Sequence, residues 1–280
     1  MTETAALVSG QLDEIAPGVR RLVAHNASYM TGPGTNTYLV GRDRHAVIDP
    51  GPLGDEHVQR ILAQTNGRID MVLVTHTHRD HSPAAVVIAQ ATGAQLLGRA
   101  PPDDGRQDLS FVPTRTLHDN DHVGVDGLTL RAVHTPGHAS NHLCYVLEAT
   151  GLIFTGDHLM QGSTVVIAPP DGHMGQYLRS LQRLQGEPVT RIAPGHGLTI
   201  EDAQAEITRI IAHRLQREAK VASGLTAAGR ATVDALVERV YDDVDPRLHA
   251  LAKSSLLAHL IKLEEDGRAQ REGEAWTLRQ

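Results

Sequence analysis

The chain of 280 residues is poor in several residue types: it has one cysteine, one tryptophan, two phenylalanines and no lysine before Lys220. The single cysteine, Cys144, excludes an internal disulfide bond, and aromatic residues at 3% leave the core to aliphatic side chains. No stretch approaches the roughly 20 apolar residues that span a bilayer. The segment after Met1 lacks the basic region and apolar run of a signal peptide. We therefore expect a cytoplasmic protein with no membrane partner.

Histidine, in contrast, is frequent, with 17 residues in all. Residues 75–81 read Thr-His-Thr-His-Arg-Asp-His and directly follow the apolar stretch 71–74. Polar groups at the end of a buried strand cost stability unless something binds them. Three further apolar runs lead to His138, Asp157 and His196. Because ligands tend to lie on loops that a rigid sheet holds in place, this repetition predicts a metal site.

Counting the possible donors predicts two metal ions. Seven side chains offer the nitrogen or oxygen donors of metal ligands: His76, His78, Asp80, His81, His138, Asp157 and His196. One catalytic zinc ion usually takes three protein ligands and water, so seven suit two ions. Donors of this kind favour two Zn²⁺, with Mn²⁺ or Fe as alternatives.

The seven donors divide between the two ions. One ion would be held by three histidines: His76, His78 and His138. The other would be held by a carboxylate and two histidines: Asp80, His81 and His196. Asp157 has two carboxylate oxygens and can bridge both ions. A hydroxide between the ions would be the nucleophile of a hydrolase, because metals lower the pKa of bound water.

Other side chains of these segments are candidates for catalysis or substrate binding. We expect Asp80 to be catalytic, and either His142 or His158 to donate a proton to the leaving group, although a supporting or core role fits these two equally well. Asn36 would line the pocket, and Arg79 would face an anionic substrate or solvent. A further residue, Asp49, could hold a ligand histidine by a hydrogen bond or could serve only the turn that it begins.

These motifs resemble those of the metallo-β-lactamase superfamily, whose signature is Thr-His-x-His-x-Asp-His followed by a later histidine, an aspartate and a last histidine. Within that superfamily the chain resembles the β-lactamase-like protein 2 family. The segments that carry this resemblance are 34–41, 48–51, 75–82, 137–142, 194–197 and 211–214. The resemblance implies a four-layer αββα sandwich and a zinc-dependent endoribonuclease that cleaves single-stranded RNA.

The residue pattern itself predicts an α/β fold in two domains. Residues 1–205 alternate strands and helices in two similar halves, which would pack as a four-layer αββα sandwich. Residues 206–280 predict three helices and a short hairpin, which look like a winged helix. The expected strands are 19–24, 37–41, 45–48, 70–74, 95–97, 128–133, 143–148, 152–154 and 190–193. The expected helices are 57–64, 83–91, 175–185, 207–221, 232–241 and 251–263.

Charge limits the possible partners. The formal net charge is −7, and residues 226–280 hold eight Lys or Arg against ten Asp or Glu. A winged helix without a basic surface is not expected to bind duplex DNA, so a role in shaping the substrate site or in a homodimer contact is the better expectation. Two divalent cations would make the site itself positive, so net charge does not decide between RNA and a small acyl compound as substrate.

Alternatives to the ribonuclease remain open. The same metals could hydrolyse a small thioester or lactone, as in glyoxalase II, to which the full ligand set is similar. A persulfide dioxygenase of the same fold would use His76, His138 and Asp157 with one iron ion and would consume oxygen. A non-catalytic sensor is disfavoured because no ligand is missing.

Overall fold

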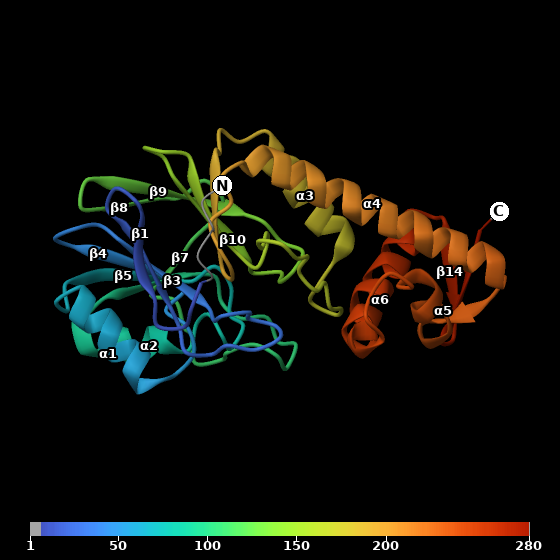
Figure 1. Cartoon of the computed structure of the whole chain (residues 1–280), viewed down its shortest axis with the longest axis horizontal. Coiled ribbons are helices and arrows are strands. Elements are labelled where there is room, and N and C mark those ends of the chain that lie inside the picture. The colour runs from blue at the N-terminus through green and yellow to red at the C-terminus, as the bar shows by residue number, and fades with distance from the viewer. Residues whose placement is uncertain (1–6, 280) are drawn as a thin grey trace. The chain divides into compact units, whose positions relative to one another are not determined.

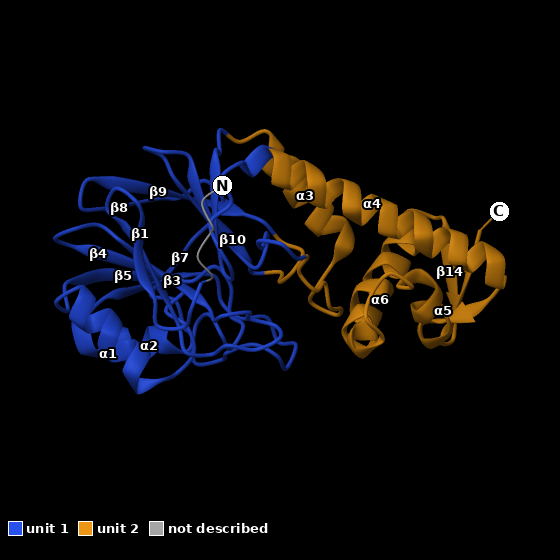
Figure 2. Cartoon of the chain, viewed as in Figure 1, with its two compact units in different colours: residues 1–135, 141–163, 188–204 blue, residues 136–140, 164–187, 205–280 orange. Residues whose placement is uncertain are grey.

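The computed structural model describes residues 7–279, which form two compact units (Figure 2). The first unit comprises residues 7–135, 141–163 and 188–204, and the second comprises residues 136–140, 164–187 and 205–279. The domain boundary between residues 205 and 206 stays a prediction. The structure adds that two earlier segments of the chain belong to the second unit.

The first unit contains a seven-stranded sheet in the order β1-β2-β3-β4-β5-β6-β7 (Figure 1). Neighbours are antiparallel from β1 to β4 and parallel from β4 to β7. The strands are β1 (Leu12–Ala16), β2 (Val19–Val23), β3 (Asn36–Val40), β4 (His45–Ile48), β5 (Ile69–Leu73), β6 (Gln95–Gly98) and β7 (Arg115–Thr116).

A second sheet of five strands has the order β12-β11-β10-β9-β8. Its pairs are antiparallel except for β11 and β12, which are parallel. The strands are β8 (His122–Val125), β9 (Leu128–His134), β10 (Leu143–Leu147), β11 (Leu152–Gly156) and β12 (Arg191–Pro194).

The two sheets pack face to face around one hydrophobic core, which includes Tyr38, Tyr145 and Phe154 beside its aliphatic side chains. Alternate residues of one strand serve two layers: Ile48 of β4 joins the core between the sheets, whereas Val47 packs with helices on the outer face. Those helices are α1 (Asp55–Gln64) and α2 (Ala84–Thr92), which cover the same face of the first sheet (Figure 1). Strands that are buried on both faces read as continuous apolar runs, which is why the sequence reveals them. The predicted α/β sandwich is confirmed.

The second unit is largely helical. Its elements are α3 (Met174–Gln185), most of α4 (Ala203–Ala228), β13 (Ala231–Thr232), α5 (Val233–Val240), the 3₁₀ turn η1 (Pro246–Leu248), α6 (His249–Glu265), β14 (Ala269–Glu272) and β15 (Ala275–Leu278). The last strands form a three-stranded sheet, β13-β15-β14, and pack with α4, α5 and α6 around Trp276. The predicted winged helix is confirmed. Across residues 7–279, no helix combines the length and apolarity that a membrane span requires.

A buried histidine makes the stability of the second unit depend on pH. His259 of α6 is fully buried, and neither of its ring nitrogens has a hydrogen-bond partner among the residues that the structure describes. Burial, and then the nearby cations Arg214 and Lys262, lower the pKa of His259 well below 6.5. The folded state therefore keeps this ring neutral, while the unfolded chain takes up a proton below a pH of about 6.5.

We expect the free energy of unfolding to keep this contribution above a pH of about 6.5 and to fall below it by up to about 1.4 kcal/mol per pH unit. His259→Leu should remove that part of the pH dependence. Trp276 is the only tryptophan and lies in the core of the second unit, so its fluorescence in urea titrations at several pH values reports the effect. Equal pH dependence in both proteins would contradict this assignment.

Candidate metal centre

The predicted ligand segments follow strands of both sheets. The segment 74–82 follows β5, which lies parallel to β4, and Asp49 follows β4 directly. In the second sheet Asp157 follows β11 and His196 follows β12, and these two strands are also parallel. Carboxyl ends of parallel strands meet at one edge of a sheet. An isolated bridge between Thr35 and His196 joins segments of the two sheets at this edge.

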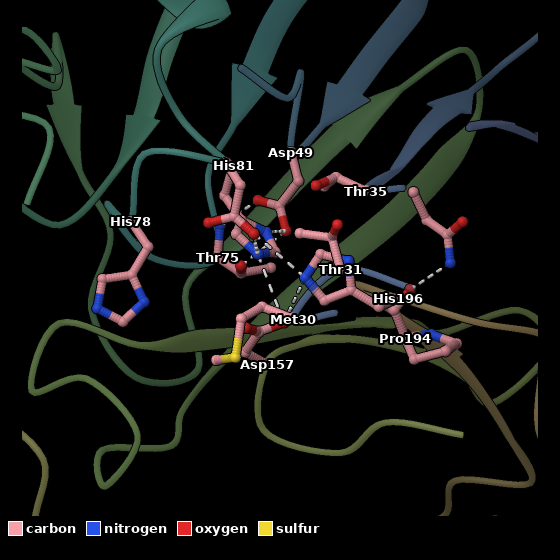
Figure 3. Close-up of polar contacts among 12 residues, drawn as sticks. Met30, Thr31, Thr35, Asp49, Thr75, His78, His81, Asp157, Pro194 and His196 are labelled. Atoms are coloured by element: carbon pink, nitrogen blue, oxygen red, sulfur yellow. Dashed lines mark hydrogen bonds and ion pairs between the residues drawn. The ribbon is translucent and has the colours of Figure 1, made fainter. Parts of the chain in front are cut away.

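One group of donors lies entirely within the first unit: Asp80, His81, Asp157 and His196. Figure 3 shows His81, Asp157 and His196 pointing toward one another. Nε2 of His81 lies 3.4 Å from Oδ2 of Asp80 and 3.4 Å from Oδ1 of Asp157. Nε2 of His196 lies 3.3 Å from each of the same two oxygens.

These four distances suit a zinc ion. A regular tetrahedron whose corners lie about 2.0–2.1 Å from a central Zn²⁺ has edges of roughly 3.3–3.4 Å. The four measured edges match that spacing. The donor group therefore fits a divalent cation in both chemistry and spacing.

The charges of this donor group also favour a divalent cation. Burial by itself lowers the pKa of His81, but Coulombic attraction to Asp80 and Asp157 outweighs it and raises the pKa well above the usual value. Burial raises the pKa of Asp80, and the imidazoles of His81 and His196 more than offset this, so the pKa of Asp80 lies well below its usual range. Protons on the imidazoles thus balance the negative charge of the carboxylates. A divalent cation can replace these protons, which couples metal binding to proton release.

Two more of the predicted ligands, His76 and His78, lie together in the first unit. Nε2 of His76 lies 2.9 Å from Nδ1 of His78. His138 lies between β9 and β10, and its Nδ1 lies 2.8 Å from the carbonyl oxygen of Val166. That hydrogen bond places the proton on Nδ1 and leaves Nε2 with its lone pair for a metal ion. The structure thus gathers four of the seven predicted ligands in one donor group within the first unit. That His138 joins His76 and His78 at a second ion, and that Asp157 bridges both ions, stay predictions.

Asp49 resolves an alternative that the sequence left open. It is 2% exposed, and its Oδ2 accepts a hydrogen bond of 2.9 Å from Nδ1 of His81. The same carboxylate accepts the backbone N–H and the hydroxyl of Thr75, each at 2.7 Å. Its backbone has a φ of 49°, a left-handed conformation that is uncommon outside glycine. Asp49 therefore orients a ligand histidine and anchors the start of the ligand segment. Thr75, which we had not singled out from the sequence, is the second part of this anchor.

We expect Asp49→Asn to weaken metal binding about 10- to 100-fold, because an amide accepts the imidazole N–H less strongly and leaves the orientation of His81 less fixed. Competition with a chromophoric chelator would measure the affinity. Asp43→Asn is a suitable control, since Asp43 is exposed on the turn before β4. An unchanged affinity in the Asp49 variant would exclude this orienting role.

Asn36, predicted to bind substrate, supports the loop of His196 in the structure. We expected it to line the substrate pocket, but it is 0% exposed. Its Nδ2 donates to the carbonyl oxygens of Pro194, at 2.9 Å, and of Gly197, at 2.8 Å. These residues flank His196, so Asn36 holds the loop that carries this predicted ligand, and a contact of Asn36 with substrate stays a prediction.

His142 and His158, the two predicted proton donors, are buried in the structure. Both are 0% exposed. Nδ1 of His142 lies 2.9 Å from Oγ1 of Thr135, and its ring stacks on that of His76 with 5.1 Å between centroids. This burial fits the supporting or core role that the sequence also allowed, and the proton-donating role of either residue stays a prediction. Arg79, in contrast, is exposed, and Asp80 is partly exposed at 30%.

Comparisons with known proteins agree with this geometry. Residues 30–196 match the model of the metallo-β-lactamase superfamily, and residues 232–276 match that of the β-lactamase associated winged helix domain. The chain is 32% identical to an atrochrysone carboxyl ACP thioesterase of Aspergillus novofumigatus over 91% of its own length and 81% of that protein. It is 30% identical to the β-lactamase-like protein 2 homolog of Drosophila melanogaster, with 91% and 90% covered.

Solved structures show the same fold. A β-lactamase domain protein from Burkholderia ambifaria aligns with a TM-score of 0.84 at 22% identity, covering 99% of this chain and 96% of that one. The similarity extends through both units.

Proposed function

Since the chain belongs to the metallo-β-lactamase superfamily, we propose that this metal-dependent hydrolase binds two zinc ions and cleaves acyl thioesters. The observation that carries the choice of substrate is a set of exposed apolar side chains on loops that are hydrogen-bonded to the ligand segments. Nine large hydrophobic side chains are exposed among residues 7–279, and five of them lie on three loops near the donor groups. We call these five the apolar rim: Tyr29, Met30, Leu53, Leu109 and Val112, each between 50% and 73% exposed.

Each of the three loops is tied to a ligand segment by a hydrogen bond. The carbonyl oxygen of Gly34 accepts from Nδ1 of His196 at 3.2 Å. The backbone N–H of Gly51 donates to the carbonyl oxygen of His81 at 2.9 Å, and that of Asp108 donates to Thr77 at 2.7 Å. Exposed apolar patches of this kind mark binding surfaces. An acyl group has the apolar surface that such a rim would cover.

Single-stranded RNA, the substrate that the sequence led us to expect first, receives less support. Strand binding needs a cationic groove with stacking aromatic side chains. Residues 1–200 carry 14 arginines against 19 acidic residues, a net charge of −5 before metals are counted. Tyr29 is the only aromatic side chain of the apolar rim. A relative named a thioesterase, 32% identical over most of the chain, favours acyl transfer to water instead.

The chain's own residues would fix the geometry of the reaction. His76, His78 and His138 would hold one cation, and the group around His81 the other. Bound divalent ions supply a Lewis acid for the thioester carbonyl and a water of lowered pKa. Asp49 keeps His81 in one orientation, and the apolar rim would exclude bulk water from the acyl chain.

The deciding experiment offers the zinc-loaded chain a hexanoyl thioester and a labelled single-stranded RNA, with and without chelator. We expect chelator-sensitive release of thiol, absent from Asp80→Ala, and intact RNA. RNA cleavage that the variant lacks, with stable thioesters, would instead identify a ribonuclease. Turnover of lactones alone would redirect the proposal within acyl hydrolysis. One iron per chain with oxygen uptake would identify a persulfide dioxygenase.

A further inference from the structure

A pocket of about 550 Å³ lies next to the ligand segment, wholly within the first unit. Its volume falls within the range of small-molecule sites. Its walls come from three loops. The residues that line it include Leu53, Arg79, Pro83, Gln107, Asp108 and Leu109.

The wall that pairs with the ligand segment is fixed in place. Gln107 pairs with His78 as an isolated β-bridge, and its Oε1 accepts the hydroxyl of Thr77 at 2.8 Å. Oδ2 of Asp108 accepts the hydroxyl of Ser82 at 2.7 Å. The pocket therefore does not depend on a ligand to form.

Arg79 is the one cation that lines this pocket. It stands between the predicted ligands His78 and Asp80 and is exposed. For its guanidinium the structure records no hydrogen bond or ion pair with any part of residues 7–279. The nearby carboxylate of Asp108 is occupied instead: its Oδ1 accepts the backbone N–H of Ser110 at 3.0 Å and its Oδ2 accepts Ser82.

The remaining lining is apolar and open. Leu53 and Leu109, both members of the apolar rim, are 67% and 66% exposed. An unpaired guanidinium beside exposed leucines suits a molecule that combines an aliphatic part with an anionic group, since arginine binds carboxylates and phosphates through paired hydrogen bonds. Two bound cations nearby would make the local electrostatic potential more positive and strengthen the preference of the pocket for an anionic group.

We propose that this pocket, through Arg79, selects thioesters that carry a negatively charged group in addition to the reacting carbonyl. The inference rests on the proposed function. The charge could belong to a carboxylate on the acyl part or to a phosphate on the thiol part, and both would meet the same guanidinium. Arg79 thereby determines specificity, while the donor groups carry out the reaction.

Three model substrates test this. The neutral reference is hexanoyl-N-acetylcysteamine, adipoyl-N-acetylcysteamine adds a carboxylate on the acyl side, and hexanoyl-4′-phosphopantetheine adds a phosphate on the thiol side. We expect Arg79→Gln to lower the ratio of kcat/KM for an anionic over the neutral substrate about tenfold. The arm in which the ratio falls identifies the source of the charge. Arg106→Gln is the matched control, because Arg106 is exposed on the loop that carries Gln107 and Asp108 and does not itself line the pocket.

A binding measurement separates this inference from the proposed function. Calorimetric titration of the zinc-loaded chain with adipate and with 4′-phosphopantetheine should give a Kd that rises about tenfold in Arg79→Gln for one of them. This readout needs no turnover, so it decides the role of Arg79 even if no thioester is hydrolysed. Equal ratios and equal Kd values in wild type and variant, for both anions, would overturn the proposal.

Discussion

Replacing Asp157 by asparagine is expected to reduce kcat/KM for thioester hydrolysis by at least about a thousandfold, which corresponds to several kcal/mol of transition-state stabilisation by the metals. Asp157 is one of two carboxylates in a group that otherwise consists of imidazoles, and its Oδ1 lies 3.4 Å from His81 and 3.3 Å from His196. An amide of the same size keeps the packing but removes the negative charge.

The metal content should change together with the rate. Without that charge the two imidazoles face a cation with one carboxylate, so we expect the ion of this group to be lost more readily and the content to fall from two ions per chain toward one. Thiol release and elemental analysis of the same preparation measure both quantities. Asp43→Asn serves as the control. Full activity with two ions in the Asp157 variant would remove this residue from the metal centre.

Much of the fold could be predicted because its central strands are buried on both faces. The run 70–74 was predicted as a strand and is observed as Ile69–Leu73, and 143–148 is observed as Leu143–Leu147. Among the missed strands, β1 is one whose sequence is not apolar. β1 contains Asp13 and Glu14, and its register places Asp13 opposite Arg21, with which it forms a salt bridge of 2.7 Å. A strand held by such a cross-strand pair leaves no hydrophobic period to detect.

The metal site was predictable in its residue types but not in the depth of each side chain. A metal ligand must be a histidine or an aspartate, so spacing after apolar runs points to it. Whether Asn36 or His142 faces substrate or core depends on contacts with residues far along the chain: Asn36 donates to the carbonyl oxygen of Pro194, 158 positions away. No local pattern encodes such a contact. Asp49 shows the same limit, since a turn and a hydrogen bond to His81 place the same residue type at this position.

The close packing behind the ligands leads to the second large effect, a loss of stability in Gly156→Ala. Gly156 ends β11 directly before Asp157 and has a φ of 44°. A Cβ atom at this position would lie 2.3 Å from Oγ1 and 2.7 Å from Cβ of Thr75. Thr75 cannot move away freely, because Asp49 accepts hydrogen bonds from both its backbone N–H and its hydroxyl.

We therefore expect Gly156→Ala to lower the free energy of unfolding by about 2–5 kcal/mol, from left-handed backbone strain together with overpacking. Metal affinity should fall as well, because Thr75 and Asp157 must both shift. Gly162→Ala is the matched control: Gly162 belongs to the same unit, has a φ of 72°, and has no atom within 4 Å of the added Cβ. Gly162→Ala should lower the free energy of unfolding only through backbone strain, by about 1 kcal/mol. Urea unfolding and chelator competition on both variants measure these differences. If the two variants were equally stable and bound zinc equally well, the contact between Gly156 and Thr75 would not be what holds Asp157 in place.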